Sequence, residues 1–427
     1  MYSKTKKWLP AALAACMLLP VGAEGASAAT APAVSIVLDD VKLPVSAPPI
    51  NSKGTILLPF RSLAEAIGVN AVWQPATKTV VAKGKNAAGE NVEVRLTLGQ
   101  KSATVNGVKY ALNAAPVNSG GSVLVPLAFF SQAFGAQVVW DGPAKTVRVT
   151  SPQREMRLLG FYAVSAYDQL PLAAGLNDVA FGWTQVDYDG AISLTDATGV
   201  RWYWPKPAGD VTPESIVAQV NASGGGSYLT VLGKDGKGQL MKMLTDKTLR
   251  DSSIERLHAL AKDNAFGGIM LDFEGLGWHD DPKMAQSVLN AYVKQLSEAV
   301  RPDGIKVALA VPPLNSEYKG YDYAALSKMA SELVIMAYDY EQADSANKNP
   351  QSVTKVDDAI RLAIAAGAPK EKLLLGINLN AENESSVDDK LGLAKRYGLG
   401  GAAFWRLGLF TDAEQAAIER SVKKIGG

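Results

Sequence analysis

The stretch GGIMLDFEG, residues 267–275, places two carboxylic acids two positions apart directly after a short apolar run. If this run is a β-strand, its side chains alternate between two faces, so Asp272 and Glu274 point the same way and Met270 lies one layer behind them. Two acids on one face oppose each other's ionisation, which helps one of them to keep its proton near neutral pH. The pair is therefore a candidate site for proton transfer.

Further polar and aromatic residues end two other apolar runs. Tyr338 and Asp339 close the run in VIMAYDY, and Trp405 closes the run GGAAFW. If the ends of these runs meet in space, an indole lies beside carboxyl groups, which suits a carbohydrate. The flat ring stacks on the sugar face while the acids transfer protons. A Glu at one strand end is usually just solvated, so this interpretation depends on the ends coming together.

The elements that would bring these ends together are short apolar stretches that alternate with helical stretches from about residue 157 onward. Such strands with helical crossovers indicate a parallel sheet covered on both faces, and eight units in about 270 residues fit a (β/α)8 TIM barrel. A doubly wound sheet is the alternative, but no glycine-rich phosphate loop follows the first strand. In a barrel the active site gathers where the strands end. The predicted strands are Leu158–Ala163, Asp178–Trp183, Ser227–Gly233, Gly267–Phe273, Lys306–Val311, Leu333–Asp339, Lys372–Asn378 and Gly401–Trp405.

Residues 31–150 contain an internal repeat. The stretch 58–80 aligns without gaps on 125–147 and keeps a Pro, a Gly, a Trp and a Lys in step. Each unit is typical of short strands, one short helix closed by Gly68 or Gly135, and a two-strand hairpin. We therefore expect a small duplicated α+β domain ahead of the barrel.

This repeat resembles the copper amine oxidase N-terminal, or stalk, domain. Residues 31–150 contain no His, so the resemblance brings no copper site with it. Trp73 and Trp140 hold equivalent positions in the two units, where a core role is more common than stacking on sugars. The resemblance implies a spacer or a cell-wall-binding module and no catalytic role.

The first 28 residues are typical of an export signal, with three Lys, an apolar stretch from Trp8 to Val21 and small residues at 26–28. Residues 13–16 also resemble a lipoprotein cleavage box, but the apolar run continues beyond Cys16, which favours an ordinary signal. Cys16 is the only cysteine, so a chain cleaved near Ala29 has neither a disulfide framework nor thiol catalysis. The expected segments are a signal peptide over 1–28, the duplicated domain over 31–150 and the barrel over 155–427.

The composition narrows the class of protein. The 427 residues are 47% hydrophobic and 20% charged, enough chain for two domains with their own cores. The formal net charge is only +1, so nothing indicates nucleic acid or an anionic membrane as a partner. After the signal no apolar run reaches the roughly 20 residues that span a bilayer. With His258 and His279 as the only histidines, a His-rich metal site is excluded, and we expect neither metal nor cofactor.

GGIMLDFE and MAYDY resemble the two signature motifs of glycoside hydrolase family 18, and GGAAFWRLG resembles its final strand. The resemblance covers the chain from about residue 155 to the end. It implies substrate-assisted retaining catalysis, in which the substrate's own 2-acetamido oxygen is the nucleophile and one acid touches the leaving group. Glu274 would be that acid, Asp272 would accept the acetamido N–H, and Tyr338 would donate its O–H to the acetamido oxygen.

The same resemblance implies how the sugar is held. Trp405 would form the floor of its pocket. Asp339 would either position the acetamido pair or cap a loop. Tyr162, on the first strand, is a candidate substrate contact and equally a candidate core residue, and the same holds for Trp183 on the second strand.

The substrate class follows from finer likeness. FGWTQVDYDG, IMLDFEGL and FWRLG look more like the spore-germination and cortex-lytic branch than like chitinases. We therefore expect an exported enzyme that cleaves β-linked N-acetylglucosamine glycans of peptidoglycan or spore cortex, secreted or located at the cell wall or spore surface of a Gram-positive bacterium. A chitinase and an inactive, lectin-like glycan-binding protein are the alternatives.

Two departures from the family pattern bear on the site. The acidic motif usually runs D-x-x-D-x-D-x-E, whereas Gly267 and Met270 replace its first two acids here, and Phe161 stands where the family places a tyrosine. Met270 and Phe161, the two replacements expected beneath Asp272, are both apolar, which predicts ordinary apolar packing in the layer below this acid. Only about 22 residues separate the last two predicted strands, too few for the inserted subdomain of many chitinases, so we expect a shallow groove.

Overall fold

The computed structural model describes residues 34–86, 88–163, 167–196, 198–200, 203–340 and 348–426. The predicted export signal, with Cys16, lies outside the described residues. Within these ranges no helix combines the length and the apolar character needed to cross a bilayer.

The N-terminal part is built from three sheets and two short helices. The sheets have the strand orders β12-β13-β1-β2, β10-β11-β4-β3 and β5-β6-β7-β8-β9. The elements are β1 (Ser35–Leu38), β2 (Val41–Lys42), β3 (Ile50–Ser52), β4 (Thr55–Pro59), α1 (Phe60–Ala66), β5 (Asn70–Gln74), β6 (Thr79–Lys85), β7 (Asn91–Thr97), β8 (Ser102–Val105), β9 (Val108–Ala111), β10 (Val117–Ser119), β11 (Ser122–Pro126), α2 (Leu127–Ala133), β12 (Gln137–Asp141) and β13 (Thr146–Thr150).

The predicted repeat is present, since β4-α1-β5-β6 corresponds to β11-α2-β12-β13. Gly68 and Gly135 follow the two helices with φ of 72° and 85°, the left-handed conformation that glycine adopts without strain. The strands β4 and β11 pair antiparallel, and Leu58 lies opposite Val125, its own counterpart in the alignment. The two units are therefore related by an approximate two-fold axis through this strand pair.

The two equivalent tryptophans differ in environment. Trp73 is half-buried and packs against the N-terminal core, which includes Phe130 and Phe134. Trp140 is 51% exposed. The expectation that both belong to the core is therefore wrong for Trp140, because identical residues in a duplicated unit meet different neighbours.

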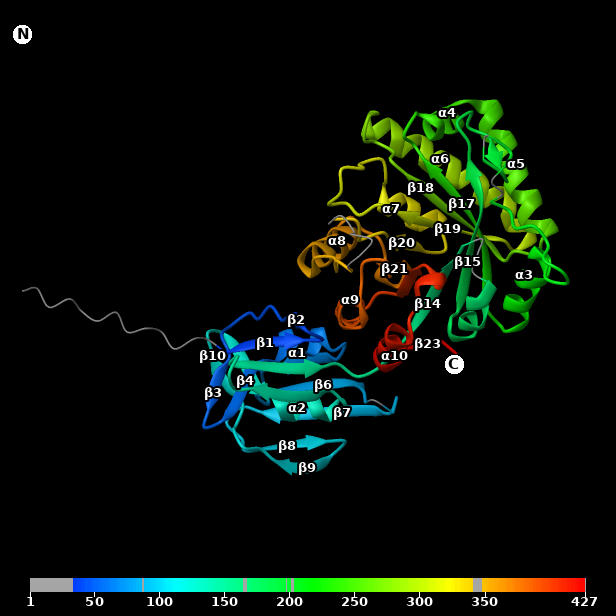
Figure 1. Cartoon of the computed structure of the whole chain (residues 1–427). Coiled ribbons are helices and arrows are strands. Elements are labelled where there is room, and N and C mark those ends of the chain that lie inside the picture. The colour runs from blue at the N-terminus through cyan, green and yellow to red at the C-terminus, as the bar shows by residue number, and fades with distance from the viewer. Residues whose placement is uncertain are drawn as a thin grey trace, which may run out of the picture. The chain divides into compact units, whose positions relative to one another are not determined.

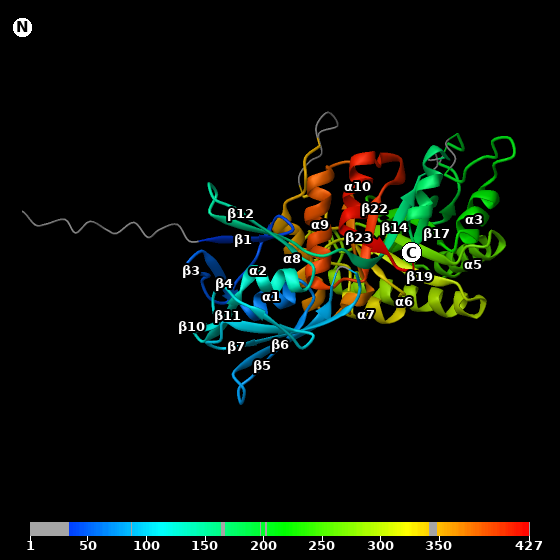
Figure 2. The same cartoon turned by 90° about the horizontal axis from the view of Figure 1, so that it is seen from below.

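The C-terminal part is a closed barrel of eight parallel strands, because β14 pairs with both β15 and β22. This confirms the predicted TIM barrel. Figures 1 and 2 show the helices on the outside of the strands. The barrel strands are β14 (Arg154–Tyr162), β15 (Asp178–Val186), β17 (Gly226–Lys234), β18 (Gly268–Glu274), β19 (Lys306–Val311), β20 (Leu333–Ile335), β21 (Leu373–Asn378) and β22 (Gly401–Trp405).

Two short strands extend the barrel sheet: β16 (Ile192–Ser193) pairs with β15, and β23 (Val422–Lys424) pairs with β14. The helices of this part are α3 (Pro213–Ala222), α4 (Gln239–Thr245), α5 (Lys247–Asp263), α6 (Pro282–Val300), α7 (Tyr323–Met329), α8 (Val353–Ala365), α9 (Glu384–Tyr397) and α10 (Asp412–Ser421), with 3-10 turns η1 (Tyr167–Gly175), η2 (Arg301–Asp303), η3 (Lys370–Lys372) and η4 (Leu407–Leu409).

The strand β20 is shorter than predicted. It ends at Ile335, and the next residues form tight turns in which Ala337 N–H donates to the Ile335 carbonyl and Tyr338 N–H to that of Met336. Asp339 has a positive φ of 62°, which a β-strand does not allow. The predicted strand was too long because the apolar run continues through the turn.

Side chains of β18 divide between two cores. Leu271 and Phe273 belong to the large cluster between strands and helices, whereas Met270 belongs to a smaller cluster inside the barrel, together with Phe161 and Met336. Met270 is fully buried there. The prediction that the layer beneath Asp272 is ordinary apolar packing is confirmed.

Candidate active site

The acid pair lies at the carboxyl end of β18, directly above the apolar filling of the barrel. Alternation along the strand turns Asp272 and Glu274 inward, on the same face as Met270. Asp272 is 5% exposed, whereas the Glu274 side chain is 33% exposed. Oδ1 of Asp272 is buried and has no hydrogen-bond partner among the described residues. A buried acceptor of this kind is rare in folded proteins and fits a donor supplied by a ligand.

Lysine 234 is a site residue that the sequence analysis missed. Lys234 ends β17 and lies opposite Glu274 in the strand register, and its Nζ is 3.6 Å from Glu274 Oε2. The signal was present in the sequence, because Lys234 directly follows the third predicted strand as Glu274 directly follows the fourth. Because a lysine at a strand end is usually solvated, the residue type alone did not indicate that Lys234 lies in the site.

The surroundings raise the pKa of both acids. For Asp272 the larger cause is burial, followed by the charge of Glu274, while Lys234 acts in the opposite direction. Burial also raises the pKa of Glu274; Lys234 opposes this, and the charge of Asp339 adds to it. The two carboxyl groups titrate as a pair, so together they retain a proton to higher pH than two separate acids.

Tyr338 lies close to this pair. Burial, followed by the charges of Asp272, Glu274 and Asp339, raises its pKa well above 10, so the hydroxyl keeps its proton and remains a donor. Gly376 of β21 makes room for the ring, since a Cβ at this position would lie 2.9 Å from Tyr338 Cε1 and 2.7 Å from the Ile335 carbonyl oxygen. Gly376 is therefore a positioning residue for Tyr338.

Two more predicted residues lie at neighbouring strand ends. Trp405 is half-buried at the end of β22 and packs against Phe161 inside the barrel, with ring centroids 5.4 Å apart. Asp339 is exposed, and its Oδ1 accepts a hydrogen bond of 3.3 Å from Nδ2 of Asn378. Asn378 lies opposite Trp405 in the register, so this amide links the ends of β21 and β22 to the turn that carries Asp339.

Tyr162 does not join the site. Its side chain is 1% exposed and packs in the outer core against Phe181 and Trp183, with centroids 5.2 Å and 6.2 Å away. Because Phe161 faces the barrel interior, the next residue of β14 must face the helices. Trp183 is fully buried and belongs to the same core.

An exposed aromatic residue follows the acid pair and was also missed. Trp278, in the loop after β18, is 50% exposed. Its ring stacks on His279 at 4.2 Å and meets Tyr318 edge-on at 5.6 Å. The indole is therefore held by two neighbouring rings while half of its surface stays accessible to solvent.

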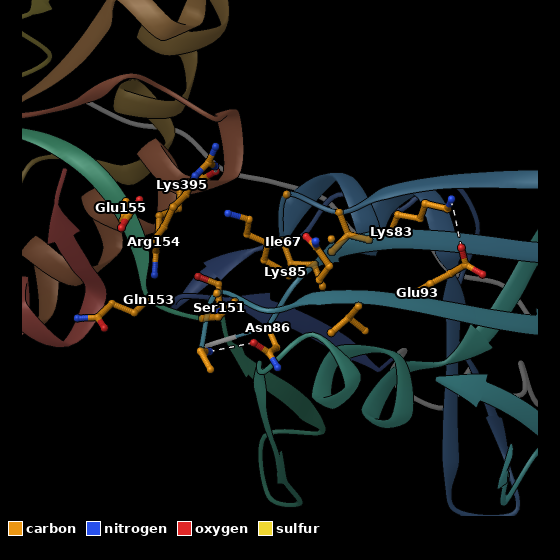
Figure 3. A pocket seen from close by; sticks show the side chains of 18 of the residues that line it. Ile67, Lys83, Lys85, Asn86, Glu93, Ser151, Gln153, Arg154, Glu155 and Lys395 are labelled. Carbon is orange, nitrogen blue, oxygen red and sulfur yellow. Dashed lines mark hydrogen bonds and ion pairs between the residues drawn. The ribbon is translucent and has the colours of Figure 1, made fainter. Parts of the chain in front are cut away.

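Other features lie apart from the acid pair. Within the described ranges, no group of three or more His, Cys, Asp or Glu is placed to hold a metal ion. A hollow of about 850 Å³ has a lining that includes Lys83, Glu93, Arg154 and Lys395, and Figure 3 shows these side chains. Its lining contains none of the site residues described above, so we do not assign it to the candidate active site.

A closed (β/α)8 barrel carries its active site at the carboxyl ends of its strands, and a pair of acidic residues is what glycosidases use for catalysis. Residues 157–382, more than half of the chain, match the model of the glycosyl hydrolases family 18, and the chain belongs to this family. Residues 37–149 match the copper amine oxidase N-terminal domain.

The chain is similar to YdhD of Bacillus subtilis (strain 168), named as a sporulation-specific glycosylase, with 24% identity over 195 residues. That match covers 45% of this chain and 42% of YdhD, so the chain spans less than half of that relative's length. Two solved structures share the fold: a chitinase from Chromobacterium violaceum (TM-score 0.51, 22% identity, 62% of this chain and 98% of that one) and the Bacillus cereus spore cortex-lytic enzyme SleL (TM-score 0.51, 16% identity, 65% and 77%).

Proposed function

We propose that this chain hydrolyses β-linked N-acetylglucosamine glycans of peptidoglycan or spore cortex by substrate-assisted, retaining catalysis. The observation that supports this best is the buried Oδ1 of Asp272, which lacks a partner among the described residues although Glu274 and Tyr338 are close. Met270 beneath it cannot donate a hydrogen bond. The amide N–H of a 2-acetamido group is a donor of the required kind.

In the proposed first step the acetamido carbonyl oxygen attacks C1 of the sugar, and Glu274 gives its proton to the leaving glycosidic oxygen. Asp272 accepts the amide N–H and stabilises the positive charge of the oxazolinium that forms. Because this hydrogen bond favours the anionic form of Asp272, the proton of the pair is left on Glu274. Tyr338 donates to the acetamido oxygen and holds it for attack.

In the second step Glu274, now a carboxylate, takes a proton from water, and the hydroxyl oxygen attacks C1. The C1–O bond of the oxazolinium breaks and the acetamido group is restored. Two displacements at C1 leave the β configuration unchanged. Trp405 forms the floor of the sugar pocket throughout.

Peptidoglycan or cortex is the proposed substrate for two reasons. The segment between β21 and β22 holds only the helix α9, so no inserted domain deepens the groove, and an open groove admits glycan strands that carry peptides. The names of YdhD and SleL refer to sporulation and to spore cortex. Together with the predicted signal, these relatives support a location at the cell wall or spore surface of a Gram-positive bacterium.

The test is to incubate the purified protein with peptidoglycan, with spore cortex and with chitin oligomers, and to identify each new reducing end. We expect N-acetylglucosamine at the reducing end of wall fragments, released first as the β-anomer. A glycan whose acetamido groups are converted to free amines should resist cleavage. Release of the α-anomer first would exclude the retaining mechanism, and binding without any release would identify a lectin.

We also propose that the N-terminal part holds the protein on the wall. A hollow of about 650 Å³ in this part is lined by residues including Ile56, Phe129 and Trp140. Trp140 is 51% exposed, and an exposed indole beside such a hollow suits stacking on a sugar.

We expect Trp140→Ala in the full-length chain to weaken co-sedimentation with cell walls severalfold, because the stacking face is removed, while hydrolysis of soluble oligosaccharides stays unchanged. Val139→Ala, at a neighbouring residue of β12 that is 61% exposed, is the matched control. Equal sedimentation of both variants would remove the wall-binding role of Trp140.

A further inference from the structure

A cation stands next to the proposed catalytic acid, and its position is fixed by the strands. Asp235 N–H, one residue after Lys234, donates to the Glu274 carbonyl at 2.9 Å. Gly233, one residue before it, is so closely packed that a Cβ would lie 2.5 Å from Leu240 Cδ2. The ends of β17 and β18 are thus held together, so the backbone of Lys234 is fixed beside that of Glu274.

A contribution to the stability of the fold does not explain why a lysine occupies position 234. Its side chain is 65% exposed, and an exposed ion pair contributes little to stability. The pair also works against the proposed chemistry, since Lys234 favours the ionised form of Glu274, whereas the acid must hold a proton when substrate is bound.

Lys234 no longer opposes protonation of Glu274 if the substrate supplies another anion with which the lysine can pair. Once Glu274 is protonated, Lys234 loses its partner, and among the described residues no second carboxylate lies within 4.0 Å of its Nζ. Asp235, the next acid along the chain, is buried and already accepts the N–H of Leu240 at 2.8 Å. A second cation lies on the same rim, where Lys237 Nζ is 4.3 Å from the ring centroid of the exposed Tyr188.

We propose that Lys234 is a specificity-determining residue that pairs with a carboxylate on the glycan beside the scissile bond. This inference rests on the proposed function and narrows its substrate class to anionic glycans. Peptidoglycan offers such a carboxylate in one of two forms, the free lactyl carboxylate of a sugar without a peptide, or the carboxylates of the peptide where one is joined to the lactyl group through an amide, and chitin offers neither. Their shared chemistry is a carboxylate close to the sugar ring.

The experiment uses three tetrasaccharides that differ only at the lactyl group. The first has a free carboxylate, the second a neutral methylamide, and the third an amide to the amino group of alanine, whose own free carboxylate lies one residue farther out. We measure kcat/KM for the full-length protein and for Lys234→Gln. We expect the wild-type protein to prefer one anionic form over the methylamide by about tenfold or more, and the variant to lose this preference mainly through KM. The preferred anion identifies which carboxylate is bound.

Two further variants make the result specific. Lys234→Arg should keep the preference, because it keeps the charge. Lys294→Gln, at an exposed position on α6, should leave every value unchanged. A wild-type protein that cleaves all three substrates equally well would overturn the inference, and so would a preference that survives in Lys234→Gln.

Failure of the proposed hydrolase function can be told apart from failure of the inference about Lys234. If none of the glycans is cleaved, the hydrolase assignment fails, and dissociation constants for the same three glycans then decide the inference. Tighter binding of a carboxylate form that is lost in Lys234→Gln would support it, and equal binding of all three would overturn it.

Discussion

Glu274→Gln loses glycan hydrolysis by a factor of about 10²–10⁴ in kcat while the protein keeps its fold and its glycan binding. General acid–base catalysis contributes this much, and in the proposed mechanism Glu274 is both the acid of the first step and the base of the second. The amide has nearly the shape of the carboxyl group but has no proton to give. Since the side chain is only partly buried, the loss of its ion pair with Lys234 costs little stability.

The measurements are kcat on a soluble N-acetylglucosamine oligomer, the dissociation constant for the same glycan, and the thermal unfolding midpoint. Glu298→Gln, which makes the same change on the exposed face of α6, is the matched control and should behave like the wild type. A Glu274→Gln protein that retains more than a tenth of wild-type turnover would show that another group is the acid.

Asp272→Asn should lower kcat by about 10²–10³, because a charged acceptor aimed at the developing oxazolinium is lost. It should also move the alkaline limb of the kcat/KM profile to lower pH. In the wild type the charge of Glu274 raises the pKa of Asp272. The same repulsion acts on Glu274 whenever Asp272 is ionised, so the pair keeps a proton to higher pH than either acid would alone. Without the charge of its neighbour Glu274 ionises more easily, although its burial still acts in the other direction.

Stability provides a second, independent readout for Asp272→Asn. The pKa of Asp272 is higher in the folded protein than in the unfolded chain, so the folded state is not penalised below the unfolded pKa and loses stability as the pH rises above it. The amide does not ionise. The variant should therefore gain in unfolding midpoint relative to the wild type as the pH rises toward about 8, the pKa of Asp272 in the folded protein. A midpoint difference that does not change with pH would contradict the raised pKa of Asp272, and an alkaline limb that does not move would contradict the pairing.

Periodicity was sufficient to locate the barrel, and the reasons it failed at some residues are physical. The apolar run of β20 extends through Met336 and Ala337 into a turn, and hydrophobicity carries no information about the positive φ of Asp339. Tyr162 was left open between the core and the substrate site, and the structure places it in the core, because a shift of one residue exchanges the inside and the outside of a strand.

The residues missed at the site have a common cause. Lys234 belongs to a type that is usually solvated at a strand end, and Trp278 belongs to a type that is usually buried, so only the neighbours of each residue reveal its place in the structure. Gly376 is understood only from the ring of Tyr338 that approaches it. The sequence proposed Glu274, Asp272, Tyr338 and Trp405 because three separate apolar runs end in chemically matching residues, and their roles in catalysis stay a proposal.

The pairing of β4 with β11 makes the two units of the N-terminal part meet as the subunits of a symmetric dimer do. Leu58 lies opposite its own counterpart Val125. In the sheet order β10-β11-β4-β3, the strands β10 and β11 of one unit correspond to β3 and β4 of the other, so the order is symmetric about its centre. This is the arrangement of an isologous homodimer, in which one surface pairs with a copy of itself. The domain has the form of such a dimer joined into one chain, and its two halves need not be identical: the indole of Trp140 is exposed to solvent while that of Trp73 lies against the core.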